Sequence, residues 1–196
     1  MFALTAPRPL IGRIIPDEGP ARWAANAALV VAGSLALWVS AKIQVPFYPV
    51  PMTLQTLAIM VIAASFGLRL GVATVLLYLA EGAFGLPVFA GTPEKGIGLA
   101  YMMGSTGGYL AGYVIAVALV GWLAERGFDR NVFKLFGAMF VGDVIVFALG
   151  LLWLGTLLGW DKPILAWGLY PFILGDLTKI ALAASAVVAG RRIMQR

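Results

Sequence analysis

The sequence predicts an all-α integral membrane protein with six transmembrane helices in a single bundle. Hydrophobic residues make up 61% of the chain and charged residues only 12%, and the mean hydropathy is +0.94, which is typical of membrane proteins rather than soluble cores. One span needs about 20 apolar residues, so the 196 residues hold six spans and leave no room for a soluble domain. The absence of Cys and His excludes disulfides and thiolate metal sites and removes the commonest general base.

The domain boundaries follow from where the long apolar segments begin and end. Residues 1–22 are expected to form a cytoplasmic tail, because they are rich in charge and proline and lack the apolar centre of a signal peptide. Residues 23–190 are expected to form the single transmembrane domain, and residues 191–196 a short basic cytoplasmic tail. Residues 125–134 are the most charged stretch, and we predict that they lie in water.

The six predicted spans are separated by segments that interrupt a helix. Residues 53–92 form one apolar block twice as long as a span, broken only at Gly67-Leu68-Arg69-Leu70-Gly71, which predicts a tight turn between two helices. Three prolines within residues 46–51 interrupt the first connection. The other connections are a Gly-rich segment at 88–106, too apolar for a disordered tether, and a Trp-rich segment at 155–170. The remaining spans are predicted at 23–41, at 107–124, from about 132, and at 171–190.

The distribution of Lys and Arg predicts the orientation of the chain. With both termini in the cytoplasm, ten basic residues fall on that side and three on the outer side, with Lys179 left in the membrane. This asymmetry follows the positive-inside rule, and it places the loops near residues 42–52, 86–104 and 158–170 outside. The cytoplasmic set comprises Arg8, Arg13, Arg22, Arg69, Arg126, Arg130, Lys134, Arg191, Arg192 and Arg196, and the outer set comprises Lys42, Lys95 and Lys162.

An acid and a base in the last span form the strongest candidate for a functional site. Asp176 and Lys179 stand three residues apart, so they share one face of a helix, where they can neutralise each other or hold one ligand between them. A charge in the hydrocarbon costs about 2.5–3.5 kcal/mol on insertion scales, which makes an intramembrane pair a functional-site hypothesis. The alternative is that the pair only stabilises the packing of this helix and binds no ligand. Both residues lie one to two turns from the predicted outer surface, so the site would face outward.

Several enzymatic chemistries lack the motifs that they require. The sequence has no Gly-x-x-x-x-Gly-Lys-Ser/Thr phosphate loop and no dinucleotide-binding fingerprint. Gly142-Asp143 and Gly175-Asp176 could suggest an intramembrane aspartyl protease, but Gly-x-Gly-Asp is absent at both places, and Lys179 would keep Asp176 ionised. We therefore predict no enzymatic activity, no metal and no cofactor, and we interpret Asp143 as a helix-packing or gating residue.

Four short segments, in this order along the chain, carry a resemblance to a known family. They are residues 49–56 (PVPMTLQT), 85–91 (GLPVFAG), 106–110 (TGGYL) and 175–179 (GDLTK). Together they resemble the BioY family, whose members are the biotin-binding S components of energy-coupling-factor (ECF) transporters. The resemblance implies a six-helix S-component fold, high-affinity capture of biotin from the outer side, uptake across the bacterial inner membrane, and partnership with a transmembrane T component and two ATPase subunits. It implies no nucleic-acid partner, and a homo-oligomer is left open.

The resemblance also suggests a role for the small residues of the first span. Ala24, Ala28 and Ala32 recur at four-residue spacing, which lets another helix approach closely. In the BioY family the small-residue face of the first helix contacts the T component, which would make these alanines a partner interface. Packing within this chain explains the spacing equally well.

The chemistry of biotin fits the candidate residues. Its ureido ring offers one acceptor oxygen and two N–H donors, so a carboxylate and an ammonium complement it through charge-assisted hydrogen bonds. Asp176 and Lys179 match the family's ureido-binding pair in type and spacing. Backbone N–H groups at the helix start near Gly107 are candidates for the valerate carboxylate, and Glu81 is expected to contact the ligand, to contact Lys179 or to reach water. The predicted substrate-binding set is Asp176, Lys179, Gln55, Tyr78, Glu81, Gly107, Gly108 and Tyr109.

A second function class remains open from the residues alone. A self-sufficient carrier or channel for a small polar solute would use Asp143, Asp176 and Lys179 as a coupling relay across the membrane. Another vitamin in place of biotin is a variant of the first class.

Overall fold

The computed structural model describes residues 10–13, 16 and 18–194. Most of the predicted N-terminal tail (1–22) and the last two residues of the predicted C-terminal tail therefore lie outside the described residues. Apart from one small hairpin and the connecting segments, the described residues form helices. The elements are η1 (Leu10–Arg13), α1 (Pro20–Lys42), β1 (Gln44–Val45), β2 (Met52–Thr53), α2 (Gln55–Ala83), α3 (Gly98–Met102), α4 (Gly107–Ala124), η2 (Phe128–Arg130), α5 (Val132–Leu158), α6 (Ile164–Gly168) and α7 (Ile173–Ile193).

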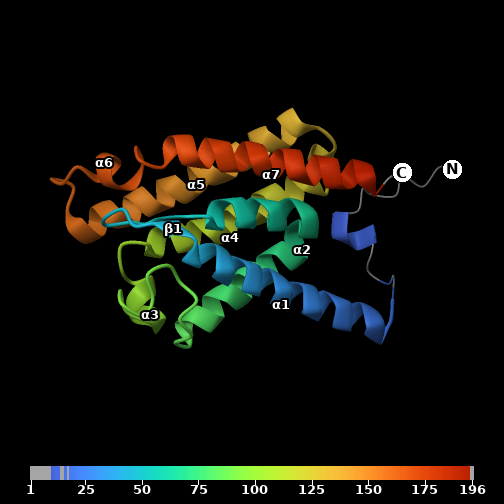
Figure 1. Cartoon of the computed structure of the whole chain (residues 1–196), viewed down its shortest axis with the longest axis horizontal. Helices are drawn as coiled ribbons and strands as arrows, with labels where there is room; N and C mark the ends of the chain where they lie inside the picture. The colour runs from blue at the N-terminus through green and yellow to red at the C-terminus, as the bar shows by residue number, and fades with distance from the viewer. Residues whose placement is uncertain (1–9, 14–15, 17, 195–196) are drawn as a thin grey trace.

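Helix α2 consists of two arms that meet at Gly67. This residue has φ 77° and ψ −174°, a backbone conformation that glycine adopts without steric cost. Helix α4 crosses at the same place, because a Cβ on Gly121 would lie only 2.7 Å from the carbonyl carbon of Gly67. The turn predicted at residues 67–71 is therefore present, and Figure 1 shows the two arms of α2 running in different directions from it.

The helices that can span a membrane are α1, α2, α4, α5 and α7. Within the described part of the chain, five helices are long and apolar enough to cross a membrane, with α6 and α7 counted as one and the arms of α2 as one. The six predicted helical segments are all present once the arms of α2, residues 55–66 and 68–83, are counted separately. The first arm has no exposed residue, and α2 as a whole packs against α1, α4 and α7, so α2 forms the centre of the bundle.

Glycines bring α4 and α5 into close contact behind that central helix. A Cβ on Gly112 of α4 would lie 2.7 Å from the Cα of Val146 on α5, so the two backbones approach as small residues in membrane helices allow. Gly155 of α5 similarly accommodates the ring of Trp160. The pair α4–α5 therefore forms a tightly packed wall on which side chains are placed with little freedom.

The connections contain short elements that the sequence analysis did not predict. The Pro-rich segment after α1 is closed by the antiparallel pair β1–β2, with Gln44 opposite Thr53 and Val45 opposite Met52. The Gly-rich and Trp-rich segments contain the single-turn helices α3 and α6. Figure 1 shows β1, α3 and α6 gathered at one end of the bundle, while the first turn of α1 and the last turn of α7 lie at the other. We call the first of these the loop end.

At the other end, the prediction that residues 125–134 lie in water was wrong for Asp129. Helix α7 continues to Ile193, and the boundary of the transmembrane domain at residue 190 stays a prediction. Asp129, predicted to lie in water, is fully buried, and Arg191, in the predicted basic cytoplasmic tail, is only 2% exposed. The two side chains form an ion pair, which joins the α4–α5 connection to the end of α7. Each charge is buried because the other compensates it.

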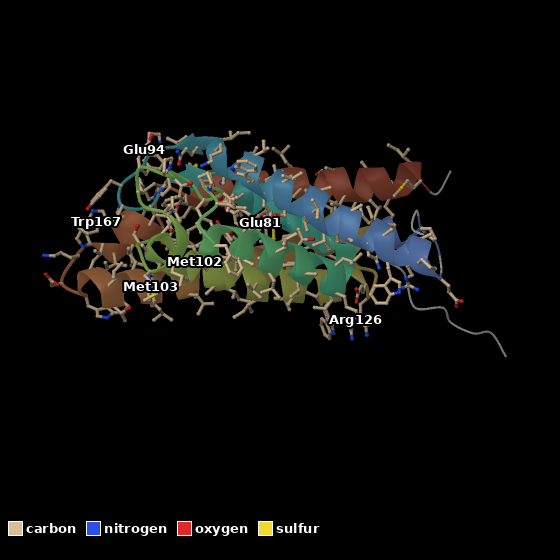
Figure 2. All side chains as sticks on the ribbon, turned by 90° about the horizontal axis from the view of Figure 1, so that it is seen from below. Glu81, Glu94, Met102, Met103, Arg126 and Trp167 are labelled. Atoms are coloured by element: carbon tan, nitrogen blue, oxygen red, sulfur yellow. The ribbon has the colours of Figure 1, made fainter. Side chains whose placement is uncertain are left out.

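We predict that the loop end faces outward. Glu94 lies at the loop end and Arg126 toward the other end (Figure 2), and both are exposed. In this Cys-free chain, an impermeant thiol reagent applied to intact cells should label Glu94→Cys but not Arg126→Cys, and permeabilised cells should label both. Labelling of Arg126→Cys alone from outside would reverse the orientation.

Candidate ligand-binding site

A cavity lies at the loop end, where α2, α4, α5 and α7 meet the connecting segments. Its wall combines a polar group of residues with a larger group of aromatic and aliphatic ones, as small-molecule sites commonly do. The lining residues are Val50, Pro51, Thr53, Gln55, Thr56, Phe89, Ala90, Tyr101, Thr106, Tyr109, Leu110, Tyr113, Asp143, Val146, Phe147, Phe172, Asp176 and Lys179.

The polar wall is centred on Asp176 and Lys179. They lie in the first two turns of α7, where their spacing of three residues places them side by side, and they form an ion pair with side chains 6% and 12% exposed. The Lys179 Nζ also donates a hydrogen bond to the carbonyl oxygen of Thr53 at 2.8 Å. The Thr56 hydroxyl bonds the Asp176 carboxylate. This network fixes both charged groups at the cavity surface.

A second polar chain supports the cavity from behind. Gln55, in the first turn of α2, donates from Nε2 to the hydroxyl of Tyr78 at 2.8 Å. The Tyr78 hydroxyl donates in turn to the carbonyl of Val88 at 3.1 Å. Gln55 lines the cavity, whereas Tyr78 is fully buried and does not. Tyr78 therefore orients Gln55 and the segment after α2 rather than forming part of the wall itself.

Aromatic rings form the apolar part of the wall. Phe89 stacks on Tyr101 with ring centroids 4.9 Å apart, and Phe147 meets both Tyr109 and Phe172 at 6.0 Å. Such offset and edge contacts are favourable between aromatic rings. The Tyr109 hydroxyl is directed away to the carbonyl of Gly168 at 2.9 Å, so the ring presents carbon to the cavity. The arrangement suits a ligand with an apolar body.

The segment Phe89–Thr92, which contributes Phe89 and Ala90 to the wall, is held by the last residue of α1. The Lys42 ammonium donates to the carbonyl oxygens of Phe89 and Thr92 at 2.9 and 3.1 Å and to the Thr92 hydroxyl at 2.9 Å. A Lys ammonium has three donors, and three acceptors of one short segment receive them. Lys42 therefore ties the wall of the cavity to α1.

Besides Tyr78, three members of the predicted substrate-binding set lie apart from the cavity wall. Glu81 receives a hydrogen bond from Ser34 of α1, and Figure 2 shows it among the helices. Gly107 and Gly108 pack against α5, where a Cβ on Gly107 would lie 3.0 Å from the indole nitrogen of Trp153. None of the three lines the cavity. The structure thus brings together Asp176, Lys179, Gln55 and Tyr109, and it places Tyr78 directly behind them.

Sequence reasoning missed several lining residues. Asp143 was interpreted as a packing or gating residue, yet it lies in the cavity wall with Val146 and Phe147. Its spacing of three and four residues from them places all three on one helix face, which is a signal present in the sequence. Thr56 and Tyr113 carried no comparable signal, because polar and aromatic residues also occur frequently in helix contacts.

Comparison with known proteins places the chain in a family. The family described as the BioY family matches residues 16–196. The chain belongs to the BioY family. A "Probable biotin transporter BioY" from Pyrococcus horikoshii is 35% identical over 155 residues, covering 79% of this chain and 87% of that protein. The "Biotin transporter BioY" of Rhizobium etli is 35% identical over 176 residues, covering 85% and 90%.

A solved structure supports the fold. The chain resembles the crystal structure of an S-component for biotin from an ECF-type ABC transporter with a TM-score of 0.76 and 24% sequence identity, covering 91% of this chain and 95% of the other. The predicted S-component-like bundle is therefore confirmed. The BioY match includes every residue that lines the cavity, so the cavity belongs to the part of the chain that the family shares.

Proposed function

We propose that this BioY protein binds biotin in the loop-end cavity and takes it up across the cell inner membrane as the substrate-binding S subunit of an ECF transporter. The observation that carries the proposal is the buried Asp176–Lys179 pair in the polar wall of a cavity that is otherwise aromatic. The transporter names of the BioY relatives support it. The role is binding and transport rather than catalysis.

The ureido ring of biotin matches the polar wall. The Lys179 ammonium donates to the ureido oxygen, and the Asp176 carboxylate accepts one ureido N–H. Both bonds involve a charged partner and are therefore stronger than bonds between neutral groups. Lys179 keeps its position through the carbonyl of Thr53, so the donor is oriented before the ligand arrives. Preorganisation of this kind raises affinity because less freedom is lost on binding.

The remainder of biotin fits the rest of the cavity. The thioether ring is apolar and lies against the rings of Phe147, Phe172 and Tyr109. The valerate carboxylate is directed to the start of α4, where the helix N-terminus favours an anion. Because the Gly107 N–H already bonds the carbonyl of Gly104 at 3.1 Å and Gly108 does not line the cavity, the N–H group of Tyr109 is the proposed donor.

The first helix supplies the proposed contact with the T component, and through it the two ATPase subunits. Ala24, Ala28 and Ala32 are all exposed, and α1 packs on α2 with its other face. Small side chains on an exposed membrane helix allow a second helix to approach closely.

Replacing Ala28 by Trp should leave biotin binding unchanged and should reduce biotin uptake in cells that contain the ATPase module. The bulky ring blocks close approach of another helix but lies far from the cavity. Leu152→Trp on α5, which replaces an exposed residue on a helix remote from α1, is the matched control and should retain uptake. If Ala28→Trp loses both binding and uptake, the three alanines pack against other parts of this chain and do not form a partner interface.

Purified protein and radiolabelled biotin test the proposed function directly. We expect saturable, stoichiometric binding in detergent without ATP and without an ion gradient. Absence of saturable binding would overturn the proposal. Proton-dependent biotin uptake into liposomes that contain this chain alone would favour a self-sufficient carrier instead.

A further inference from the structure

Asp143 is a buried acid in the cavity wall to which the proposed site gives no role. It lies on α5 and is 7% exposed. Its Oδ1 atom is buried and has no hydrogen-bond donor among the described residues. Val146 and Phe147, on the same face of α5, line the same cavity. Asp143 therefore belongs to the wall against which a ligand would lie.

An unsatisfied carboxylate at this position needs an explanation. Helix α5 is among the most apolar segments of the chain, and burying a polar group without a hydrogen bond is unfavourable. Nearly all buried polar groups in native proteins have a partner, so an exception indicates a missing donor. The donor that Asp143 lacks would have to come from a ligand or from water.

The neighbouring charged groups do not supply this donor. Lys179 pairs with Asp176 and donates to the carbonyl of Thr53, and no ion pair joins it to Asp143 among the described residues. Asp176 is an acceptor already bonded by Lys179 and Thr56. Asp143 therefore adds a hydrogen-bond acceptor to the cavity wall, and the ammonium of Lys179 is already bonded to other groups.

We infer that Asp143 is a ligand-binding residue that accepts a hydrogen bond from the second ureido N–H, the one not taken by Asp176. This inference rests on the proposed function. The ureido ring has one acceptor and two donors, and the pair Asp176–Lys179 matches one of each. Asp143 supplies the remaining acceptor, so the cavity selects cyclic ureas that carry two free N–H groups.

The test is a double-mutant cycle in which one change is made in the protein and the other in the ligand. Binding of biotin and of two analogues, each methylated on a different ureido nitrogen, is measured for the unaltered chain and for Asp143→Ala. The substitution should weaken biotin binding roughly tenfold or more, as expected for a hydrogen bond to a charged group. For the analogue that carries its methyl group on the nitrogen facing Asp143, the affinity should be almost the same in the variant and in the unaltered chain. For the other analogue, the substitution should weaken binding as much as it weakens the binding of biotin.

Two further variants keep the result interpretable. Asp143→Asn preserves the shape and one acceptor oxygen, so it should fold and bind biotin with intermediate affinity. Val144→Ala, on the exposed face of the same helix, should bind as the unaltered chain does. An equal loss for biotin and both analogues, or no loss for biotin, would overturn the role of Asp143 while leaving the proposed function intact. Failure of the unaltered chain to bind biotin would overturn both.

Discussion

Replacing Lys179 by Met should weaken biotin binding by more than tenfold and should cause a larger loss than any other single substitution in the cavity. The change removes the donor for the ureido oxygen and leaves the buried Asp176 without its ion-pair partner. Truncating one member of a buried, hydrogen-bonded charge pair costs about 2–5 kcal/mol, and each 1.4 kcal/mol is about tenfold in affinity. Titration of purified protein with radiolabelled biotin measures the effect.

The double variant Asp176→Asn with Lys179→Met separates ligand binding from helix seating. Replacing both charges of a buried pair can be neutral for stability, so this variant should fold. If the pair holds the ligand, the folded double variant should still fail to bind biotin. Recovery of unaltered affinity would show that the pair only seats α7. Thr178→Ala, an exposed neighbour on the same helix, is the matched control and should bind biotin normally.

Arg191→Met should produce the largest loss of stability. Arg191 is 2% exposed and pairs with Asp129, which is fully buried, so the substitution strands a carboxylate between η2 and α7. Removing one partner of a buried ion pair typically destabilises a protein by about 3–5 kcal/mol. Thermal unfolding in detergent should show a markedly lower midpoint, whereas biotin affinity of the folded fraction should be unchanged because the cavity lies at the other end of the bundle.

Two further variants serve as controls for the effect of Arg191→Met on stability. Arg192→Met changes the exposed neighbour of Arg191 and should leave the unfolding midpoint almost unaltered. Asp129→Asn combined with Arg191→Met removes both charges and should recover most of the lost stability. A midpoint for Arg191→Met equal to that of Arg192→Met would mean that the buried pair does not contribute to stability.

Much of the fold could be predicted from the sequence because membrane helices are specified locally. Apolar length places α4 and the start of α5, and the glycine at residue 67 marks a turn that requires positive φ. The central residues of the site could also be predicted from the sequence. Asp176 and Lys179 are conspicuous because charge is rare in such a segment, and their spacing alone places them on one helix face.

The remaining features depend on contacts between distant parts of the chain. Arg191 follows a glycine at the end of an apolar segment, which is typical of a solvated basic flank, and only the folded chain brings Asp129 beside it. Glu81 could have reached the ligand, Lys179 or water; its partner is Ser34, 47 residues earlier. Gly107 and Gly108 were predicted as an anion site, but the close approach of α5 determines which way they face.

The three hydrogen bonds from Lys42 give α1 a mechanical connection to the ligand. They join the end of the first helix to the segment Phe89–Thr92, which forms part of the cavity wall, so a displacement of α1 is transmitted to that wall. A partner that binds one position of α1 more tightly than another must then alter the affinity for the ligand. Thermodynamic linkage makes the effect reciprocal, so an occupied cavity would change the affinity for that partner by the same factor.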